Sequence, residues 1–68
     1  MYDSSLALLV EAAAVLRGED SVPRGFIVEA LELVESGQKT VPMYPSGAPS
    51  LKAIYDLALC LYTGTLQN

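Results

Sequence analysis

The side chains that could do chemistry in this chain are one thiol, a set of carboxylates and scattered hydroxyls. A serine or cysteine nucleophile needs a neighbouring base, and the sequence contains no histidine to act as one. Cys60 lies within an apolar stretch, where a buried thiol is inert, so we expect it to have a packing role. Glu29 and Glu32 stand three residues apart, which is typical of solvated charge on an exposed helix face.

The sequence also lacks a recognisable site for a metal or a phosphate. One cysteine and no histidine exclude a zinc site built from nitrogen and sulfur ligands, and no aspartate-rich calcium loop is present. The run Pro45-Ser46-Gly47-Ala48 lacks the glycine pattern and the lysine of a phosphate-binding loop. We therefore expect no cofactor, no metal and no enzymatic activity, and a function in binding instead.

Size and composition predict a partner chain. At 68 residues the chain is one domain at most, spanning 1–68, and a domain of this size buries only about 60% of the surface that its unfolded form exposes. The composition is 51% hydrophobic and 18% charged, whereas globular proteins average about 25% charged residues. A small chain this poor in charge is expected to cover part of its apolar surface with another subunit or another protein.

The charge distribution limits what that partner can be. The net charge is −4, which disfavours direct binding to nucleic acid or to an anionic membrane. The basic residues form no cluster: they are Arg17, Arg24, Lys39 and Lys52. No apolar run is long enough to span a bilayer, and the first residues lack the basic start of a signal peptide. With a lone free thiol, these features predict a cytoplasmic location.

Three segments with helical periodicity must position these side chains. They cover residues 4–17, 22–36 and 50–63. The connecting loop, residues 38–49, holds three prolines and one glycine, which forbid a helix there. The predicted fold class is all-α, with two long helices plus a third in a helical hairpin or three-helix unit, packed as a symmetric homodimer.

Start and stop signals support these boundaries. A residue able to cap the first amides precedes each segment: Asp3 or Ser4, the run Glu19-Asp20-Ser21, and Ser50. Pro23 suits a first helical turn because its missing N–H is not needed there. A glycine that can adopt a left-handed conformation follows each segment: Gly18, Gly37 and Gly64.

Apolar residues spaced three or four apart define the expected core and dimer contacts. These residues are Leu6, Leu9, Val10, Leu16, Phe26, Ile27, Leu31, Ile54, Tyr55 and Leu61. The first segment carries a second apolar face at Leu8, Ala12 and Val15, and Glu11 is its only polar residue between Leu6 and Leu16. A helix apolar almost all round should be buried almost all round. We expect a second copy to cover it, with contact to a different protein as the alternative.

Two further features are candidates for binding a partner. Glu29, Glu32 and Glu35 on the outer side of the second segment can engage a basic surface, or serve only solubility. Met43 and Tyr44 lie in the apolar stretch Val41–Pro45, and both residue types are enriched in interface cores. This stretch is expected to run extended, and either binds a partner or folds back as a lid over the helices.

The sequence resembles a known family in several of these elements. The run Leu9 to Leu16, the turn from Arg17 to Val22, and the helix through Ile27, Leu31 and Glu35 resemble the YmgB/AriR family of small helical bacterial connector proteins. The closing helix follows a similar pattern at Leu57, Leu61, Tyr62 and Thr63. The resemblance implies a helical dimer that takes part in biofilm and stress regulation through protein contacts. The proline-rich loop departs from the shorter connection of that family.

The functional expectation is a non-enzymatic regulator that binds and modulates a larger protein, such as a transcription regulator. In its small size and acidity the chain also resembles phage-encoded inhibitors of host regulators or machines, which is one alternative. A structural subunit of a larger assembly is another.

Overall fold

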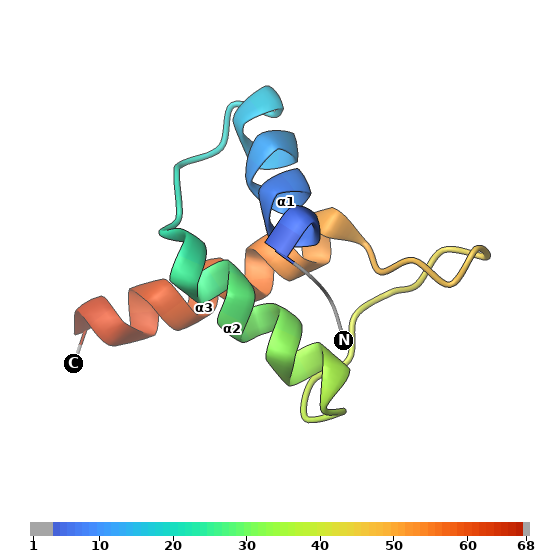
Figure 1. The fold of residues 1–68 in the computed structure, drawn as a ribbon. Coiled ribbons are helices and arrows are strands. Elements are labelled where there is room, and N and C mark those ends of the chain that lie inside the picture. The colour runs from blue at the N-terminus through green and yellow to red at the C-terminus, as the bar shows by residue number, and fades with distance from the viewer. Residues whose placement is uncertain (1–3, 68) are drawn as a thin grey trace.

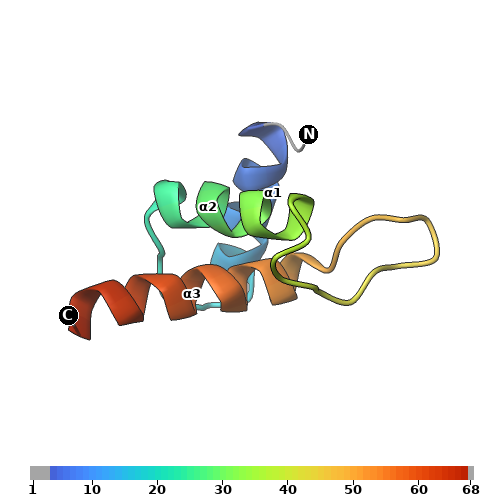
Figure 2. The same cartoon turned by 90° about the horizontal axis from the view of Figure 1, so that it is seen from below.

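The structure, a computed structural model that describes residues 4–67, confirms the all-α fold class. It contains helices α1 (Ser4–Leu16), α2 (Arg24–Glu35) and α3 (Leu51–Gln67), and no strand forms within the described residues. Each helix packs against both others. α2 and α3 are stacked across one another and α1 lies against the pair (Figures 1 and 2).

Two of the three predicted glycine stops end a helix. Gly18 has φ +76°, its N–H donates to the Val15 carbonyl at 3.0 Å, and the next N–H, of Glu19, donates to the Ala14 carbonyl at 3.0 Å. α2 ends in the same way at Gly37, where φ is +82°. The Gly37 N–H donates to the Val34 carbonyl at 3.2 Å, and the Gln38 N–H donates to the Leu33 carbonyl at 3.0 Å. Only glycine adopts this left-handed conformation without strain, so both ends are fixed by the residue type.

The other boundaries differ from the sequence prediction. α2 begins at Arg24 rather than at residue 22, with Pro23 as its N-cap and no side-chain cap bond, so the cap expected from the run Glu19-Asp20-Ser21 is wrong. The proline ring disfavours helical geometry in the residue before it, and Val22 stays outside the helix. The Ala53 N–H does donate to Ser50 Oγ at 3.3 Å. The cap expected at Asp3 lies outside the described residues.

α3 continues beyond its expected end. Gly64 lies inside the helix and has no positive φ, so the prediction that it ends α3 is wrong. Threonines on either side stay helical by donating to carbonyls one turn back: Thr63 Oγ1 to Leu59 and Thr65 Oγ1 to Leu61, both at 3.0 Å. Such local bonds are compatible with a continuing helix.

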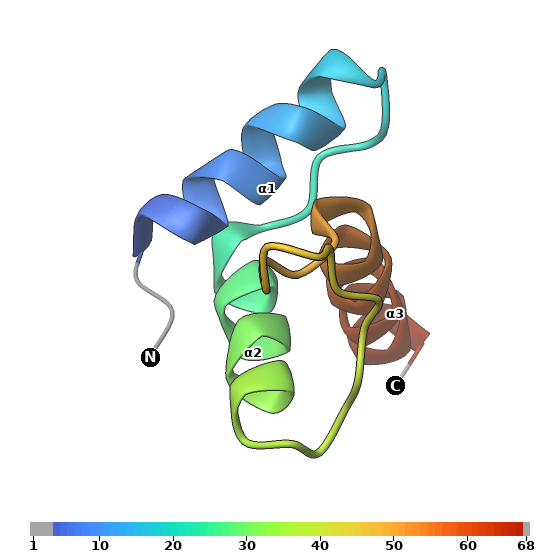
Figure 3. The same ribbon diagram turned by 90° about the vertical axis from the view of Figure 1, so that its right-hand side faces the viewer.

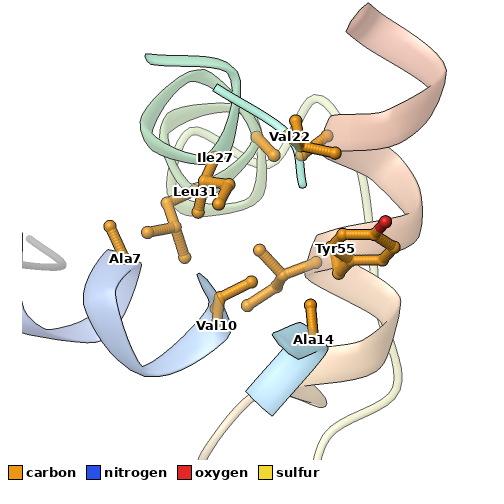
Figure 4. Close-up of a cluster of buried hydrophobic side chains, with 10 residues drawn as sticks. Ala7, Val10, Ala14, Val22, Ile27, Leu31 and Tyr55 are labelled. Carbon is orange, nitrogen blue, oxygen red and sulfur yellow. The ribbon is translucent and has the colours of Figure 1, made fainter. Parts of the chain in front are cut away.

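The core lies where the three helices meet. Buried apolar side chains from α1, the α1–α2 linker, α2 and α3 point toward one another (Figure 4). They are Ala7, Val10, Ala14, Val22, Ile27, Ala30, Leu31, Ile54, Tyr55 and Ala58. Leu6, Phe26 and Leu61 are partly buried against this cluster, and the Phe26 and Tyr62 rings lie 5.2 Å apart between α2 and α3.

Leu9 and Leu16 lie outside the core of the single chain, contrary to the spacing argument. They are 57% and 88% exposed, because α1 turns the row Ala7, Val10 and Ala14 toward the other helices. Apolar side chains lie on more than one face of α1. The face that packs inward is the one with the smaller side chains, because it allows the closer approach to α2 and α3. The assignment of Leu9 and Leu16 to a dimer interface stays a prediction.

Tyr55 connects the α1–α2 linker to α3. Its side chain is 2% exposed, its hydroxyl donates to the Asp20 carbonyl, and the Arg17 guanidinium lies 5.8 Å from its ring centroid. Burial raises the pKa of Tyr55, and the nearby carboxylates of Glu19, Asp20 and Asp56 raise it further. The neutral hydroxyl therefore holds the linker in place.

Residues 38–50 form a loop whose middle part projects away from the three helices (Figures 1 and 2) and is seen end-on in Figure 3. Met43 and Pro49 form an isolated antiparallel bridge, the Tyr44 N–H donates to the Ala48 carbonyl at 2.8 Å, and the Gly47 N–H donates to the Tyr44 carbonyl at 2.8 Å. With Gly47 at φ +89°, this is a three-residue hairpin turn. The lid alternative is wrong for this segment.

Candidate protein-binding surfaces

The described residues were considered first as a possible metal site. Among them, no three His, Cys, Asp or Glu side chains come close enough to hold a metal ion, and every buried side-chain nitrogen or oxygen has a hydrogen-bond partner. None of the helices described is long and apolar enough to cross a membrane.

Cys60 is one feature that the sequence argument placed incorrectly. It is exposed, not packed in the core. The buried row of α3 runs through Ile54 and Ala58, and Cys60 stands about 200° around the helix from Ala58. The neighbouring leucines on both sides, Leu59 and Leu61, are the residues that pack against the core.

The outer face of α1 forms an open apolar groove with the first turn of α2. The groove is lined by Leu8, Glu11, Ala12, Val15, Leu16 and Arg24. Arg24 Nε donates to Glu11 Oε2 at 3.0 Å, so the two charged residues of the groove form an ion pair between the helices. Around them, Leu8 is 47% exposed and Val15 is 63% exposed. We call these six residues the α1 groove.

The three predicted glutamates lie on the solvent side of α2. Glu29, Glu32 and Glu35 are all exposed, and their three-residue spacing keeps them on one face of the helix. The buried residues Ile27 and Leu31 occupy the other side. This arrangement is an acidic face, which suits long-range attraction of a basic surface.

Met43 and Tyr44 lie on the projecting hairpin. Their side chains are 53% and 55% exposed, although the hairpin backbone is held by the turn hydrogen bonds. The base of the hairpin is anchored, since Val41 packs against the core and Pro49 is buried. We call Met43 and Tyr44 the hairpin tip. The tip extends beyond α2 (Figure 1), so the predicted partner-binding residues fall on two surfaces.

Sequence reasoning missed the role of Arg24 in the α1 groove. Arg24 looked like one of four scattered bases. The signal that could have found it is Glu11, the only charged residue of α1, because a carboxylate among apolar residues needs a positively charged neighbour.

Comparison with protein-family models, curated proteins and solved structures finds no match to this chain.

Proposed function

We propose that this chain is a non-enzymatic regulatory protein that binds and modulates a larger protein, with the hairpin tip as its main contact. One observation carries the proposal: two adjacent large side chains, Met43 and Tyr44, are 53% and 55% exposed at the end of a hydrogen-bonded hairpin. Methionine and tyrosine are enriched in interface cores. A loop that is already ordered loses less conformational entropy on binding.

The acidic face supports a preference among partners. Glu29, Glu32 and Glu35 give the outer side of α2 a negative field, and the whole chain carries a charge of −4. Such a field speeds encounter with a basic protein surface and repels nucleic acid. A DNA-binding transcription regulator has a surface of that kind, so we propose one as the partner class, met in the cytoplasm.

The proposed mechanism is occupation of a partner surface by a homodimer. The dimer would present two copies of the hairpin tip, and it would shift the conformational equilibrium of the partner if it bound one state more tightly than the other. This mechanism fits a connector like those of the YmgB/AriR family, and equally a phage-encoded inhibitor. A structural subunit is the second candidate, favoured by the exposed apolar side of α1.

The test measures partner affinity at the hairpin tip. Wild-type protein, Tyr44→Ala and the matched control Leu66→Ala, which removes another exposed large side chain (66% exposed), are each immobilised and used to capture and then titrate the bound protein. Tyr44→Ala should weaken binding about tenfold or more, as for an aromatic hot spot, while Leu66→Ala binds like the wild type. Equal affinity of all three proteins would contradict the proposal.

A structural subunit gives a different result. An isolated chain that is folded and soluble favours the regulator, whereas a chain that folds only when its assembly partners are present favours the subunit.

A further inference from the structure

The α1 groove is an apolar surface that the described part of the chain leaves uncovered. Leu16 at its end is 88% exposed and Val15 is 63% exposed, on the same helix that buries Ala7 and Val10 completely. A leucine exposed to this degree beside another exposed apolar side chain indicates contact with a further molecule.

The charge of the α1 groove indicates which molecule can bind there. Glu11 and Arg24 cancel one another through their 3.0 Å contact, so the groove has no net charge, although the chain carries −4. A basic partner would instead be attracted to the acidic face of α2. A second copy of the same groove meets neither repulsion nor an uncompensated charge. Within the described contacts, Arg24 donates only through Nε, which leaves its other N–H groups able to reach the carboxylate of a second Glu11.

The spacing of the groove residues indicates how two α1 helices would pack against one another. Leu8, Ala12 and Leu16 follow one another at four-residue intervals along α1, with the small residue in the middle. In a two-fold, antiparallel pair of helices that crosses at Ala12, the two alanines allow close approach, and Leu8 of each copy packs on Leu16 of the other. Antiparallel α1 helices also place opposite dipole ends together.

We propose that the α1 groove is a homodimer interface in which two α1 helices pack antiparallel about Ala12. This inference rests on the homodimer of the proposed function and assigns its surface. The hairpin and the first turn of α2 lie on opposite sides of α1 (Figure 1), so pairing at the α1 groove would leave both hairpin tips accessible. Two linked tips on one dimer would raise the avidity for a partner with two matching sites.

The length of α1 limits the affinity expected for the dimer. Thirteen residues make a helix about 20 Å long. A standard interface of about 800 Å² per partner would cover nearly a fifth of the 4424 Å² surface of the chain, more than one face of this helix supplies. The dimer should therefore depend on concentration, with a Kd on the order of micromolar.

Cysteine crosslinking tests the geometry in a Cys60→Ser background. Under mild oxidation, Ala12→Cys should form a covalent dimer with itself, because residue 12 lies on the two-fold axis. Leu8→Cys mixed with Leu16→Cys should crosslink more than either variant alone. Self-crosslinking of Leu16→Cys as efficient as the mixture would overturn the antiparallel arrangement.

Light scattering after size exclusion tests the surface itself. The wild type should change from monomer to dimer mass as its concentration rises, Ala12→Asp should stay monomeric with unchanged helicity, and Leu66→Asp should behave like the wild type. A monomer mass at every concentration, or a dimer insensitive to Ala12→Asp, would overturn the inference. Tyr44→Ala should still dimerise, so partner binding that is unchanged in Tyr44→Ala, with the dimer intact, contradicts only the proposed function.

Discussion

Removing the hydroxyl of Tyr55 should destabilise the protein measurably, although it deletes a single oxygen atom. The Tyr55 side chain is 2% exposed and its hydroxyl donates to the Asp20 carbonyl. Tyr55→Phe keeps the ring in the core and under the Arg17 guanidinium. The change therefore isolates the hydrogen bond that holds the α1–α2 linker against α3.

The magnitude follows from where the acceptor lies. Losing a typical hydrogen bond costs about 0.5–1.5 kcal/mol, and leaving a buried acceptor unpaired costs about 1–3 kcal/mol. Asp20 is an exposed residue, so water can reach its carbonyl once the hydroxyl is gone. We expect a loss of about 1 kcal/mol, which lowers the Tm of a domain of this size by about 4–8 °C.

Thermal unfolding followed by circular dichroism measures the effect, and Tyr62→Phe is the matched control. Tyr62 is a partly buried tyrosine of the same helix whose ring packs on Phe26, without a described hydroxyl bond across the fold. Its variant should change the Tm by less than a third of the Tyr55→Phe effect. Equal Tm values for Tyr55→Phe and the wild type would show that the linker contact contributes nothing and would refute the reasoning.

Four further predictions follow from the same contacts, from the glycines and from the charge of the chain. Because the folded state raises the pKa of Tyr55, its stabilising contribution is complete below the unfolded pKa of about 10 and is lost as pH rises through the folded value; denaturant titrations above that pH should show a weaker pH dependence for Tyr55→Phe than for the wild type. Gly18→Ala should destabilise by about 1 kcal/mol because φ is +76°, and an unchanged denaturation midpoint would contradict the helix-end geometry. Gly64→Ala should instead stabilise by about 0.5–1 kcal/mol, since Gly64 is helical and the added methyl meets no side chain and no other part of the fold within 4 Å beyond its chain neighbours; a loss of stability would mean that α3 ends before it. Added salt should weaken binding of a basic partner at α2, because it screens the acidic face; titrations at two salt concentrations that give equal affinities would contradict this.

The fold class could be predicted because periodicity and glycine stops are local signals. Gly18 and Gly37 end α1 and α2 as expected, each with a positive φ. Gly64 shows the limit of the same signal, since the residue type permits a stop without requiring one, and side-chain bonds from Thr63 and Thr65 accompany the continuing helix.

The core of α1 could not be predicted from spacing alone. Leu9 and Leu16 follow helical periodicity as well as Val10 does, and the packing decision depends on how closely α2 and α3 approach. The helix buries Ala7 and Ala14 instead, because small side chains allow close contact. Periodicity therefore predicted a core face through Leu9, Val10 and Leu16. Of the residues that α1 buries, that face contains Val10 but neither Ala7 nor Ala14.

The hairpin was visible in the sequence but was not recognised. Proline followed by serine and glycine in Tyr44-Pro45-Ser46-Gly47-Ala48 matches a type I turn with a left-handed glycine after it. This run was compared only with a phosphate-binding loop, and the hairpin turn was not predicted. The turn is what presents Met43 and Tyr44 outside the helices, so the candidate site depends on it.

The central claim is that the hairpin tip contacts another protein, and a photoreactive phenylalanine derivative incorporated at position 44 tests it most directly. Irradiation of cells that express this variant should give a discrete adduct with one larger protein. The same derivative at position 66 serves as the control, because Leu66 is 66% exposed at the far end of α3. An adduct at position 44 that is absent at position 66 supports the account. Identical adducts at both positions, or none at position 44, would contradict it.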